Sequence, residues 1–161
     1  MKTKKMKKVL IALDYDLTSQ KVAETGFSLA KTMGSEVILM HVISDSVDYT
    51  PMENSPRLGF IGLKDPGKLQ AESIEGLKNK SQQFLDKSKH HLGDNSIQTL
   101  VKDGDCAESI LKTAKDLHID IIVMGSHSRR WLENIVMGSV TEKVLHNTSI
   151  PLFIVPTKKH D

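Results

Sequence analysis

The amino-acid sequence predicts a doubly wound α/β fold built around a five-stranded parallel sheet. Apolar runs such as VLIAL and VILMHVI are continuous rather than alternating, which is typical of strands covered on both faces. Segments with helical spacing separate these runs, as in repeated strand–helix–strand units. We expect strands at Val9–Asp14, Glu36–Ile43, Ile97–Lys102, Asp120–Gly125 and Leu152–Val155.

Helical periodicity of apolar residues marks four segments between these strands. After the first segment, Gly34 stands where a left-handed helix cap belongs. At the start of the third, Asp105 and Glu108 have the spacing of a capping arrangement. We expect helices from about Ser19 to Gly34, from Lys68 to Leu92, after Asp105, and from Gly138–Ser139 to about Asn147.

The length of the chain predicts a single domain that comprises residues 1–161. A chain of this length is too short for two ordinary domains, and its 39% hydrophobic residues suffice for one core. Residues 1–7 form a basic tail, and residues 44–66 form a long loop with three prolines. A connection of that length is usually functional or mobile.

The charge balance and the cysteine count exclude several classes of function. Lys and Arg total 22 against 20 for Asp and Glu, so no strong positive field points to a nucleic-acid partner. Cys106 is the single cysteine, which excludes an intramolecular disulfide. No apolar segment is long enough to span a membrane, and Val9–Leu13 is too short for a signal peptide. We therefore expect a cytoplasmic protein with no membrane or nucleic-acid partner.

A pattern rich in glycine and serine follows the fourth expected strand. The chain reads GSHSRR and then, after seven residues, GSVT. Gly125 lets a ligand approach the backbone closely, and Ser126 and Ser128 can donate hydrogen bonds. Gly138 and Ser139 begin a helix whose free amides favour an anion. The pattern indicates a phosphate site, although a strand-to-helix loop with a serine cap has the same sequence.

Three stretches of the chain carry a resemblance to a known family. They read KKVLIALDYDLTSQKVAETGFSLAKTMGSEVILMHVI, GDCAESILKTAKDLHIDIIVMGS and DIIVMGSHSRRWLENIVMGSVTEKVLHNTSIPLFIV. These stretches closely resemble the universal stress protein family, and the resemblance covers nearly the whole chain outside its tails and the 44–66 loop.

The nucleotide-binding members of this family carry the motif Gly-x2-Gly-x9-Gly-Ser/Thr. Gly125, Gly138 and Ser139 fill its first, third and last positions with the spacing intact. Ser128 replaces the second glycine. Serine is small and can donate to a phosphate, but it does not freely adopt a positive φ.

The resemblance implies a fold, a ligand and a set of binding residues. The fold is a flavodoxin-like three-layer sandwich of the adenine-nucleotide alpha-hydrolase type, with strand order 3-2-1-4-5. The protein would bind ATP, with Mg²⁺, as a stress-response sensor or regulator with at most slow hydrolysis. Asp14 would face the ribose or the metal. The adenine would be held by Ala12, Leu13, Val42 and Met124, although sheet core is the more ordinary role of such residues. The implied nucleotide-binding residues are Ala12, Leu13, Asp14, Val42, Met124, Gly125, Ser126, His127, Ser128, Arg129, Gly138, Ser139, Val140 and Thr141.

The last expected strand is a candidate for subunit contact. The segment Pro151–Pro156 is short and apolar, and a proline stands at each end. By the same resemblance, it would pair with a second copy to form a symmetric homodimer.

Two other functions stay open at this point. The segment Asp14–Thr18 has the DxDxT spacing of haloacid-dehalogenase phosphatases, in which one aspartate attacks phosphorus. That chemistry also needs a distal lysine and acidic Mg²⁺ ligands after a later strand, where this chain has Ser-His-Ser-Arg. If Ser128 prevents nucleotide binding, the protein is instead a dimeric interaction module of the same family.

Two further residues are expected to have structural roles. His41 lies within the second expected strand, where a hydrogen-bonded core histidine is the ordinary case. Cys106 lies at an expected helix N-terminus, which can lower the pKa of a thiol, but inert packing is the more common role.

Overall fold

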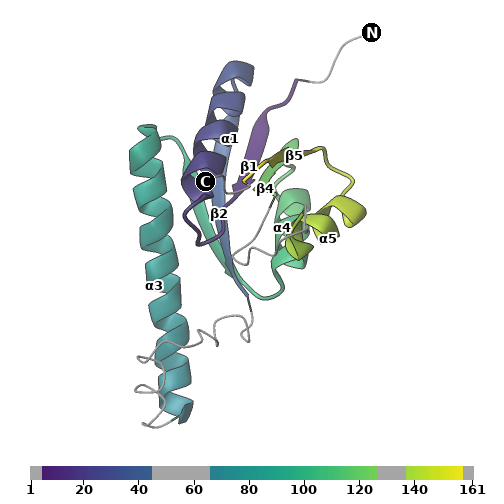
Figure 1. Ribbon diagram of the computed structural model, residues 1–161. Helices are drawn as coiled ribbons and strands as arrows, with labels where there is room; N and C mark the ends of the chain where they lie inside the picture. The colour runs from purple at the N-terminus through teal and green to yellow at the C-terminus, as the bar shows by residue number, and fades with distance from the viewer. Residues whose placement is uncertain (1–4, 45–65, 127–136, 158–161) are drawn as a thin grey trace.

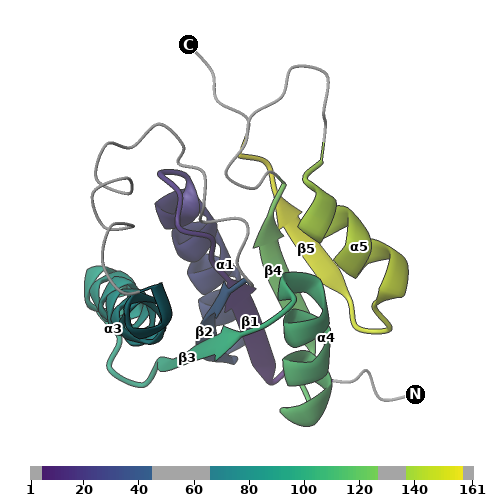
Figure 2. The same ribbon diagram turned by 90° about the horizontal axis from the view of Figure 1, so that it is seen from below.

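The computed structural model describes residues 5–44, 66–126 and 137–157, with side chains in the second range described from residue 75 onward. Its centre is one five-stranded sheet in which all neighbouring strands are parallel. The strand order is β3-β2-β1-β4-β5, as the family resemblance implies. Figure 1 shows α3 and α5 on opposite sides of the strands, and Figure 2 labels all five strands. The strands are β1 (Lys8–Ala12), β2 (Glu36–Ile43), β3 (Gln98–Asp103), β4 (Ile121–Gly125) and β5 (Leu152–Val155).

Helices cover both faces of this sheet, as the continuous apolar strands predict. Figure 2 shows α1 and α3 on one side of the strands and α4 and α5 on the other. The predicted α/β architecture, with its doubly wound parallel sheet, is therefore confirmed. The helices of the described ranges are α1 (Ser19–Met33), α3 (Pro66–Leu92), α4 (Cys106–Asp116) and α5 (Ser139–Asn147).

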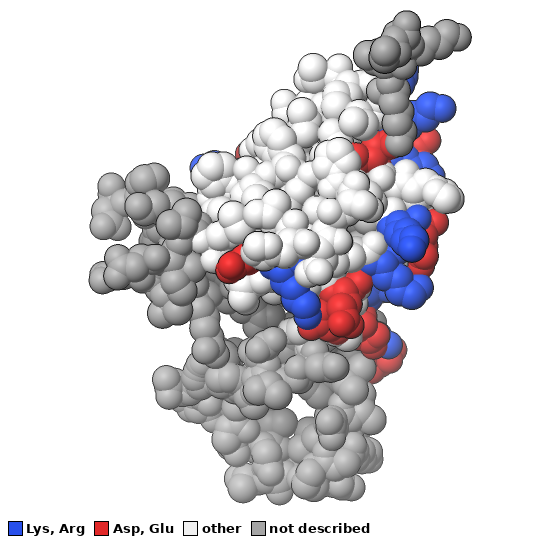
Figure 3. Space-filling view, turned by 90° about the vertical axis from the view of Figure 1, so that its right-hand side faces the viewer, with Lys and Arg blue, Asp and Glu red and all other residues white. Residues whose placement is uncertain are grey.

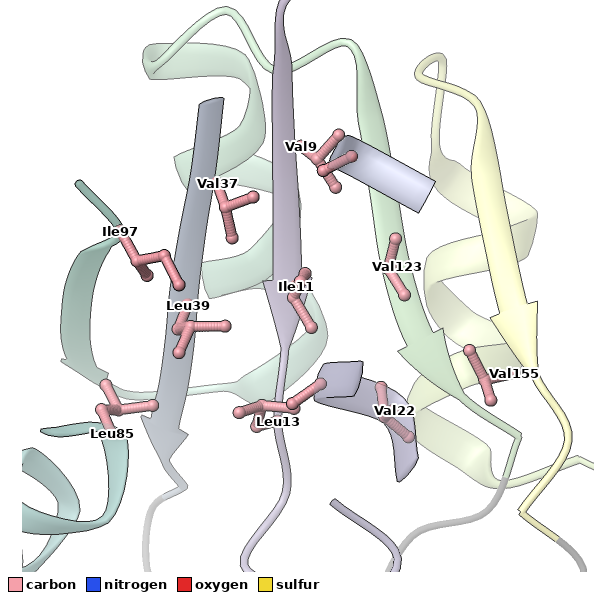
Figure 4. Close-up of a cluster of buried hydrophobic side chains, with 12 residues drawn as sticks. Val9, Ile11, Leu13, Val22, Val37, Leu39, Leu85, Ile97, Val123 and Val155 are labelled. Carbon is pink, nitrogen blue, oxygen red and sulfur yellow. The ribbon is translucent and has the colours of Figure 1, made fainter. Parts of the chain in front are cut away.

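The apolar core is divided by the sheet into two clusters. Successive residues of a strand point to opposite faces, so Ile11 packs under α1 and α3 whereas Leu10 packs on the side of α4 and α5. Figure 4 shows the first cluster, in which side chains from four strands meet Val22 of α1 and Leu85 of α3. Because Leu10, Ile11 and their neighbours are fully buried, the middle of the sheet is rigid and fixes where each strand ends.

Two glycines of α1 show why the sequence folds this way locally. A Cβ on Gly26 would lie 2.8 Å from Ile11 Cδ1, so the helix rests on the sheet at a distance that only glycine permits without rearrangement. Gly34 ends the helix with φ +65°, and its N–H is bonded to the carbonyls of Ala30 and Lys31. The cap predicted at Gly34 is confirmed.

Several predicted boundaries need correction by one or two residues. The first strand ends at Ala12, although the Leu13 N–H still donates to the Met40 carbonyl at 2.8 Å, so Asp14 lies beyond the ladder. The third strand begins at Gln98 instead of Ile97. Pro66, placed at the end of the long loop, is the first residue of α3, and residues 45–65 of that loop lie outside the described part.

Candidate functional site

The carboxyl ends of β1, β2 and β4 meet at one edge of the sheet. Ala12 pairs with Met40 of β2, and Ile11 pairs with Val123 of β4, so the ends of the three strands are held in register. Asp14 therefore lies between the end of β2 and the end of β4. Crevices outside the carboxyl ends of parallel strands are the usual ligand sites of open α/β sheets.

Helix α5 is anchored to the end of β4 by two hydrogen bonds. The Thr141 hydroxyl donates to the Gly125 carbonyl at 2.8 Å, and the Gly138 N–H donates to the Ser126 carbonyl at 2.6 Å. Together these bonds bring the first and third glycines of the motif, Gly125 and Gly138, to the same edge. In this geometry the Thr141 proton is committed to the Gly125 carbonyl.

The first turn of α5 offers backbone donors at this edge. The first intrahelical bond runs from the Glu142 N–H to the Gly138 carbonyl at 2.9 Å, so Ser139, Val140 and Thr141 have N–H groups with no acceptor inside the helix. Ser139 is exposed, and no side chain caps the helix at Gly138. A helix end of this kind attracts an anion through its amides and its dipole.

Ser126 is buried and makes its hydrogen bonds within the protein. It is only 8% exposed, and its N–H donates to the Val155 carbonyl. Its hydroxyl oxygen accepts the Thr157 N–H at 3.0 Å and lies 3.3 Å from the Thr157 hydroxyl. Ser126 therefore fastens the end of β4 to the chain that follows β5.

Asp14 begins a tight turn that the sequence did not predict. The Tyr15 N–H donates to Asp14 Oδ1 at 2.8 Å, and the Asp16 N–H donates to the Asp14 carbonyl at 2.9 Å. Asp16 Oδ1 accepts the Thr18 N–H at 3.3 Å, whereas Asp16 Oδ2 is buried and makes no hydrogen bond within the described part of the chain. The turn places two carboxylates beside the end of β1.

The four residues expected to hold adenine lie in or beside the sheet core. Leu13 is buried in the cluster under α1 and α3. Val42 and Met124 are buried in the cluster on the other face, and Ala12 is half-buried against it. All four residues thus pack in or against the sheet core, which is the more ordinary role expected for them. His127, Ser128 and Arg129 lie outside the described residues.

An aromatic cluster beside Asp14 was missed by the sequence analysis. The Tyr15 ring stacks on Phe84 of α3, with ring centroids 4.8 Å apart and planes inclined by 19°. The His41 ring meets both rings edge-on at 5.8 Å. His41 is buried, and its Nδ1 lies 2.8 Å from the Leu13 carbonyl, so the predicted hydrogen-bonded core histidine is confirmed. Because a carbonyl only accepts, Nδ1 is the donor in this bond.

An ion pair also joins α4 to α5 near the same edge. Asp105 caps α4 by accepting the Glu108 N–H at 3.0 Å, as the Asp-x-x-Glu spacing predicts. Lys143 Nζ of α5 lies 3.4 Å from Asp105 Oδ2. The bond from Glu108 lowers the pKa of Asp105 below its ordinary value, and Lys143 adds to this effect.

A separate hollow of about 440 Å³ lies at the opposite edge, where Lys5, Lys7 and Lys8 surround Asp120 and His118. Asp120 accepts the backbone N–H groups of Lys7 and Lys8, and Lys8 Nζ donates to the Leu117 carbonyl beyond α4. Lysines near a helix C-terminus satisfy its free carbonyls. These contacts join the start of β1 to Asp120 and to the segment that follows α4.

Comparison with known proteins gives one consistent result. The model of the family described as "Universal stress protein family" matches residues 5–156. Universal stress protein MJ0577 of Methanocaldococcus jannaschii is 32% identical over 156 residues, which cover 94% of this chain and 96% of that protein. Universal stress protein YxiE of Bacillus subtilis is 28% identical and is covered to 97%, against 92% of this chain.

Solved structures agree with the sequence matches. The MJ0577 structure superposes with a TM-score of 0.72 at 27% identity and covers 98% of this chain and 100% of that one. A universal stress protein in complex with cAMP superposes with a TM-score of 0.60 at 15% identity, covering 96% of this chain and 100% of that one.

None of the helices in the described ranges combines the length and apolar character that crossing a membrane requires.

Proposed function

This chain belongs to the universal stress protein family, and on that premise we propose that it binds ATP and serves as a stress-response sensor or regulator. The nucleotide would lie at the carboxyl edge of the sheet, between the turn after β1 and the first turn of α5. The observation that carries this proposal is the anchoring of α5 by the Thr141–Gly125 hydrogen bond. That bond holds the first-turn amides of α5 beside Gly125, as a phosphate chain requires.

The described residues take distinct parts in this proposal. The backbone amides of Ser139 and Val140, with the exposed Ser139 hydroxyl, would bind phosphate oxygens. Thr141 and Ser126 would act through position, since their hydroxyls are bonded within the protein. Val42 and Met124 are buried, so the adenine would contact their backbone atoms and the small exposed part of their side chains.

Three residues of the motif enter the proposal from the sequence alone. His127, Ser128 and Arg129 follow Ser126 in the chain, at the family's phosphate-binding positions. Arg129 would screen phosphate charge, and Ser128 would stand where nucleotide-binding members have glycine.

The residues present fit Mg²⁺ as a companion of the phosphates rather than as a metal held by protein alone. In the described ranges, no three His, Cys, Asp or Glu residues come together as a metal site. Asp14 is half-buried beside the edge, and Asp16 Oδ2 is a buried carboxylate oxygen without a hydrogen bond there. Mg²⁺ commonly takes one or two carboxylates together with phosphate oxygens and water. The resemblance places Asp14 at the ribose or at the metal. Where it faces the phosphates rather than the ribose, Asp14 would hold the ion, which would neutralise phosphate charge.

Hydrolysis would be slow at such a site. Rapid phosphoryl transfer to water needs a group that positions or activates the attacking water. It also needs groups that stabilise the charge on the phosphoryl oxygens in the transition state. Asp14 is a modest candidate for the first part, because one of its oxygens already accepts the Tyr15 N–H. We therefore propose binding as the function and hydrolysis as at most a minor activity.

We also propose that the protein forms a homodimer through Pro151–Pro156. Strand β5 is an edge of the sheet, and Phe153 on it is 38% exposed. Figure 3 faces the side of the molecule on which α5 and β5 lie, and a broad area of it carries no charged side chain. An exposed apolar edge strand is a ready pairing surface. Light scattering of the wild type and of Phe153→Lys would report a dimer and its loss, and a wild-type monomer would contradict this part.

Calorimetric titration with ATP and Mg²⁺ tests the proposed function. We expect saturable binding, and the absence of saturation at millimolar ATP would overturn it in favour of the interaction module. Ser139→Glu places a negative charge at the first residue of α5, where it repels phosphate but suits the helix dipole. We expect this variant to fold and to lose ATP binding. Ser149→Glu is the matched control, since Ser149 is also exposed but follows the other end of α5.

A further inference from the structure

We propose that Tyr15 and Phe84, backed by His41, are positioning residues that hold the Asp14 carboxylate in place for the nucleotide. This inference rests on the proposed function, because it assigns Asp14 a contact with the ribose hydroxyls. The three rings come from three separate elements: Tyr15 from the turn after β1, His41 from β2 and Phe84 from α3.

The residues on both sides of Asp14 are tied down by this cluster. On one side, His41 Nδ1 donates to the carbonyl of Leu13 at 2.8 Å. On the other, the Tyr15 ring is stacked on Phe84 while the Tyr15 N–H donates to Asp14 Oδ1 at 2.8 Å. With both neighbours held, the hydrogen bond from the Tyr15 N–H orients the Asp14 carboxylate.

Local hydrogen bonds hold the backbone within the turn: the Asp16 N–H donates to the Asp14 carbonyl, and the Ser19 N–H donates to the Asp16 carbonyl at 3.1 Å. Leu17 is 95% exposed and Tyr15 is 49% exposed, so neither is inserted into the core as a buried anchor. The Tyr15 ring attaches the turn to α3 and β2, which these local hydrogen bonds do not do. Phe84 is itself packed against the buried cluster under α3, and it provides a rigid support.

The chemical consequence concerns which nucleotides bind. A carboxylate with a fixed direction accepts hydrogen bonds from vicinal ribose hydroxyls, and hydrogen bonds to charged groups are the stronger ones. A carboxylate on a loose turn must first be ordered by the ligand, which weakens the same contact. The aromatic cluster would therefore set the preference for ribonucleotides over nucleotides without these hydroxyls.

A double-mutant cycle with ATP tests this assignment. We expect Tyr15→Ala and Phe84→Ala each to lower ATP affinity about tenfold. In an Asp14→Ala background, the same changes should lower it less than about twofold, because their effect passes through Asp14. Tyr15→Phe keeps the stacked ring and should retain wild-type affinity. Equal losses with and without Asp14 would overturn the proposal.

The nucleotide preference gives a second measurement. The wild type should bind ATP about tenfold more tightly than 2′,3′-dideoxy-ATP, and Tyr15→Ala should bind both with similar affinity. Phe27→Ala is the control, because Phe27 packs against the same apolar cluster as Phe84 but lies on α1, about two helical turns after Ser19. This variant should preserve the preference for ATP. An unchanged preference in Tyr15→Ala would contradict a positioning role.

A measurement without ligand separates failure of this inference from failure of the proposed function. Hydrogen exchange of the Tyr15 amide reports its bond to Asp14 directly. We expect exchange at least about fivefold faster in Phe84→Ala than in Phe27→Ala, whether or not ATP binds. If exchange is equal in the two variants, the positioning role is wrong. If exchange differs but the wild type fails to bind ATP, the cluster still orders Asp14, and the proposed ligand and the assigned ribose contact are wrong.

Discussion

The Thr141 hydroxyl donates a hydrogen bond to the Gly125 carbonyl at 2.8 Å and so joins the start of α5 to the end of β4. Thr141→Val keeps the shape of the side chain but removes the donor, which leaves a backbone carbonyl without this partner. We expect the free energy of unfolding to fall by about 1–3 kcal/mol, measured by urea denaturation. ATP binding should weaken in parallel. Thr141→Ser retains the hydroxyl and should keep ATP binding, and a valine variant as stable as the serine variant would contradict the role.

The approach of α1 to the sheet gives a second prediction. Gly26→Ala would place a methyl group 2.8 Å from Ile11 Cδ1 and 3.1 Å from Val123 Cγ1, so the helix or these side chains must shift. We expect a loss of about 1–3 kcal/mol in the free energy of unfolding. Gly76→Ala on α3 is the matched control, because a Cβ there meets nothing within 4 Å. It should raise stability by up to about 1 kcal/mol, and equal effects in both variants would show that α1 packs less tightly.

The cap at Asp105 predicts a dependence of stability on pH. The pKa of Asp105 is lowered in the folded protein by the Glu108 N–H, and the folded state therefore binds fewer protons than the unfolded chain. The resulting stabilisation is present above the unfolded value of about 3.9 and is lost as the pH falls through the lower folded value. Asp105→Ala should cost about 1 kcal/mol at neutral pH.

Denaturation curves across the acidic range check this prediction. The difference between wild type and Asp105→Ala should shrink below about pH 4. A constant difference from neutral to acidic pH would mean that the carboxylate charge is not involved. Lys143→Met removes the ion pair to Asp105 and leaves the bond from Glu108 in place, so it should reduce the pH dependence of stability only in part.

Ser128 supplies a prediction that comes from the sequence motif. Glycine at this position would permit a positive φ, whose cost for other residues is about 1–3 kcal/mol. If the loop needs that conformation to bind phosphate, Ser128→Gly should raise ATP affinity about fivefold or more. Ser128→Ala removes the hydroxyl without freeing the backbone and should show no such gain. Similar titrations for the two variants would assign any change to the hydroxyl.

Much of the fold follows from local sequence patterns. Apolar runs located the five strands to within two residues. Four of these runs are continuous, because burial on both faces leaves few polar positions, whereas β3 has fewer apolar residues and is only partly buried. Gly34 and Asp105 marked helix ends for local reasons, a positive φ and a side-chain acceptor, and both are confirmed. Boundaries such as Ala12 depended on pairing with β2, which a single segment does not encode.

The site was less accessible to sequence reasoning. The motif indicated Gly125 and Gly138, but the roles of the hydroxyls depend on partners elsewhere in the chain, such as Thr157 for Ser126. The stacking of Tyr15 on Phe84 joins residues that share no periodic pattern and no motif. A tyrosine directly after a motif aspartate is the sequence signal that could have directed attention to this turn.

The hydrogen bond from the Lys7 amide to Asp120 spans 113 positions of the chain, and it marks the place where β1 receives β4 as its second neighbour. A ribosome delivers β1, α1, β2 and β3 long before β4 and α5. The nascent chain can therefore assemble the β3-β2-β1 half while one side of β1 stays open, and pairing over such separations is slow. The site needs residues from both halves. The proposed nucleotide would stabilise this protein only after synthesis is nearly complete, so the emerging chain depends on its own apolar layers until then.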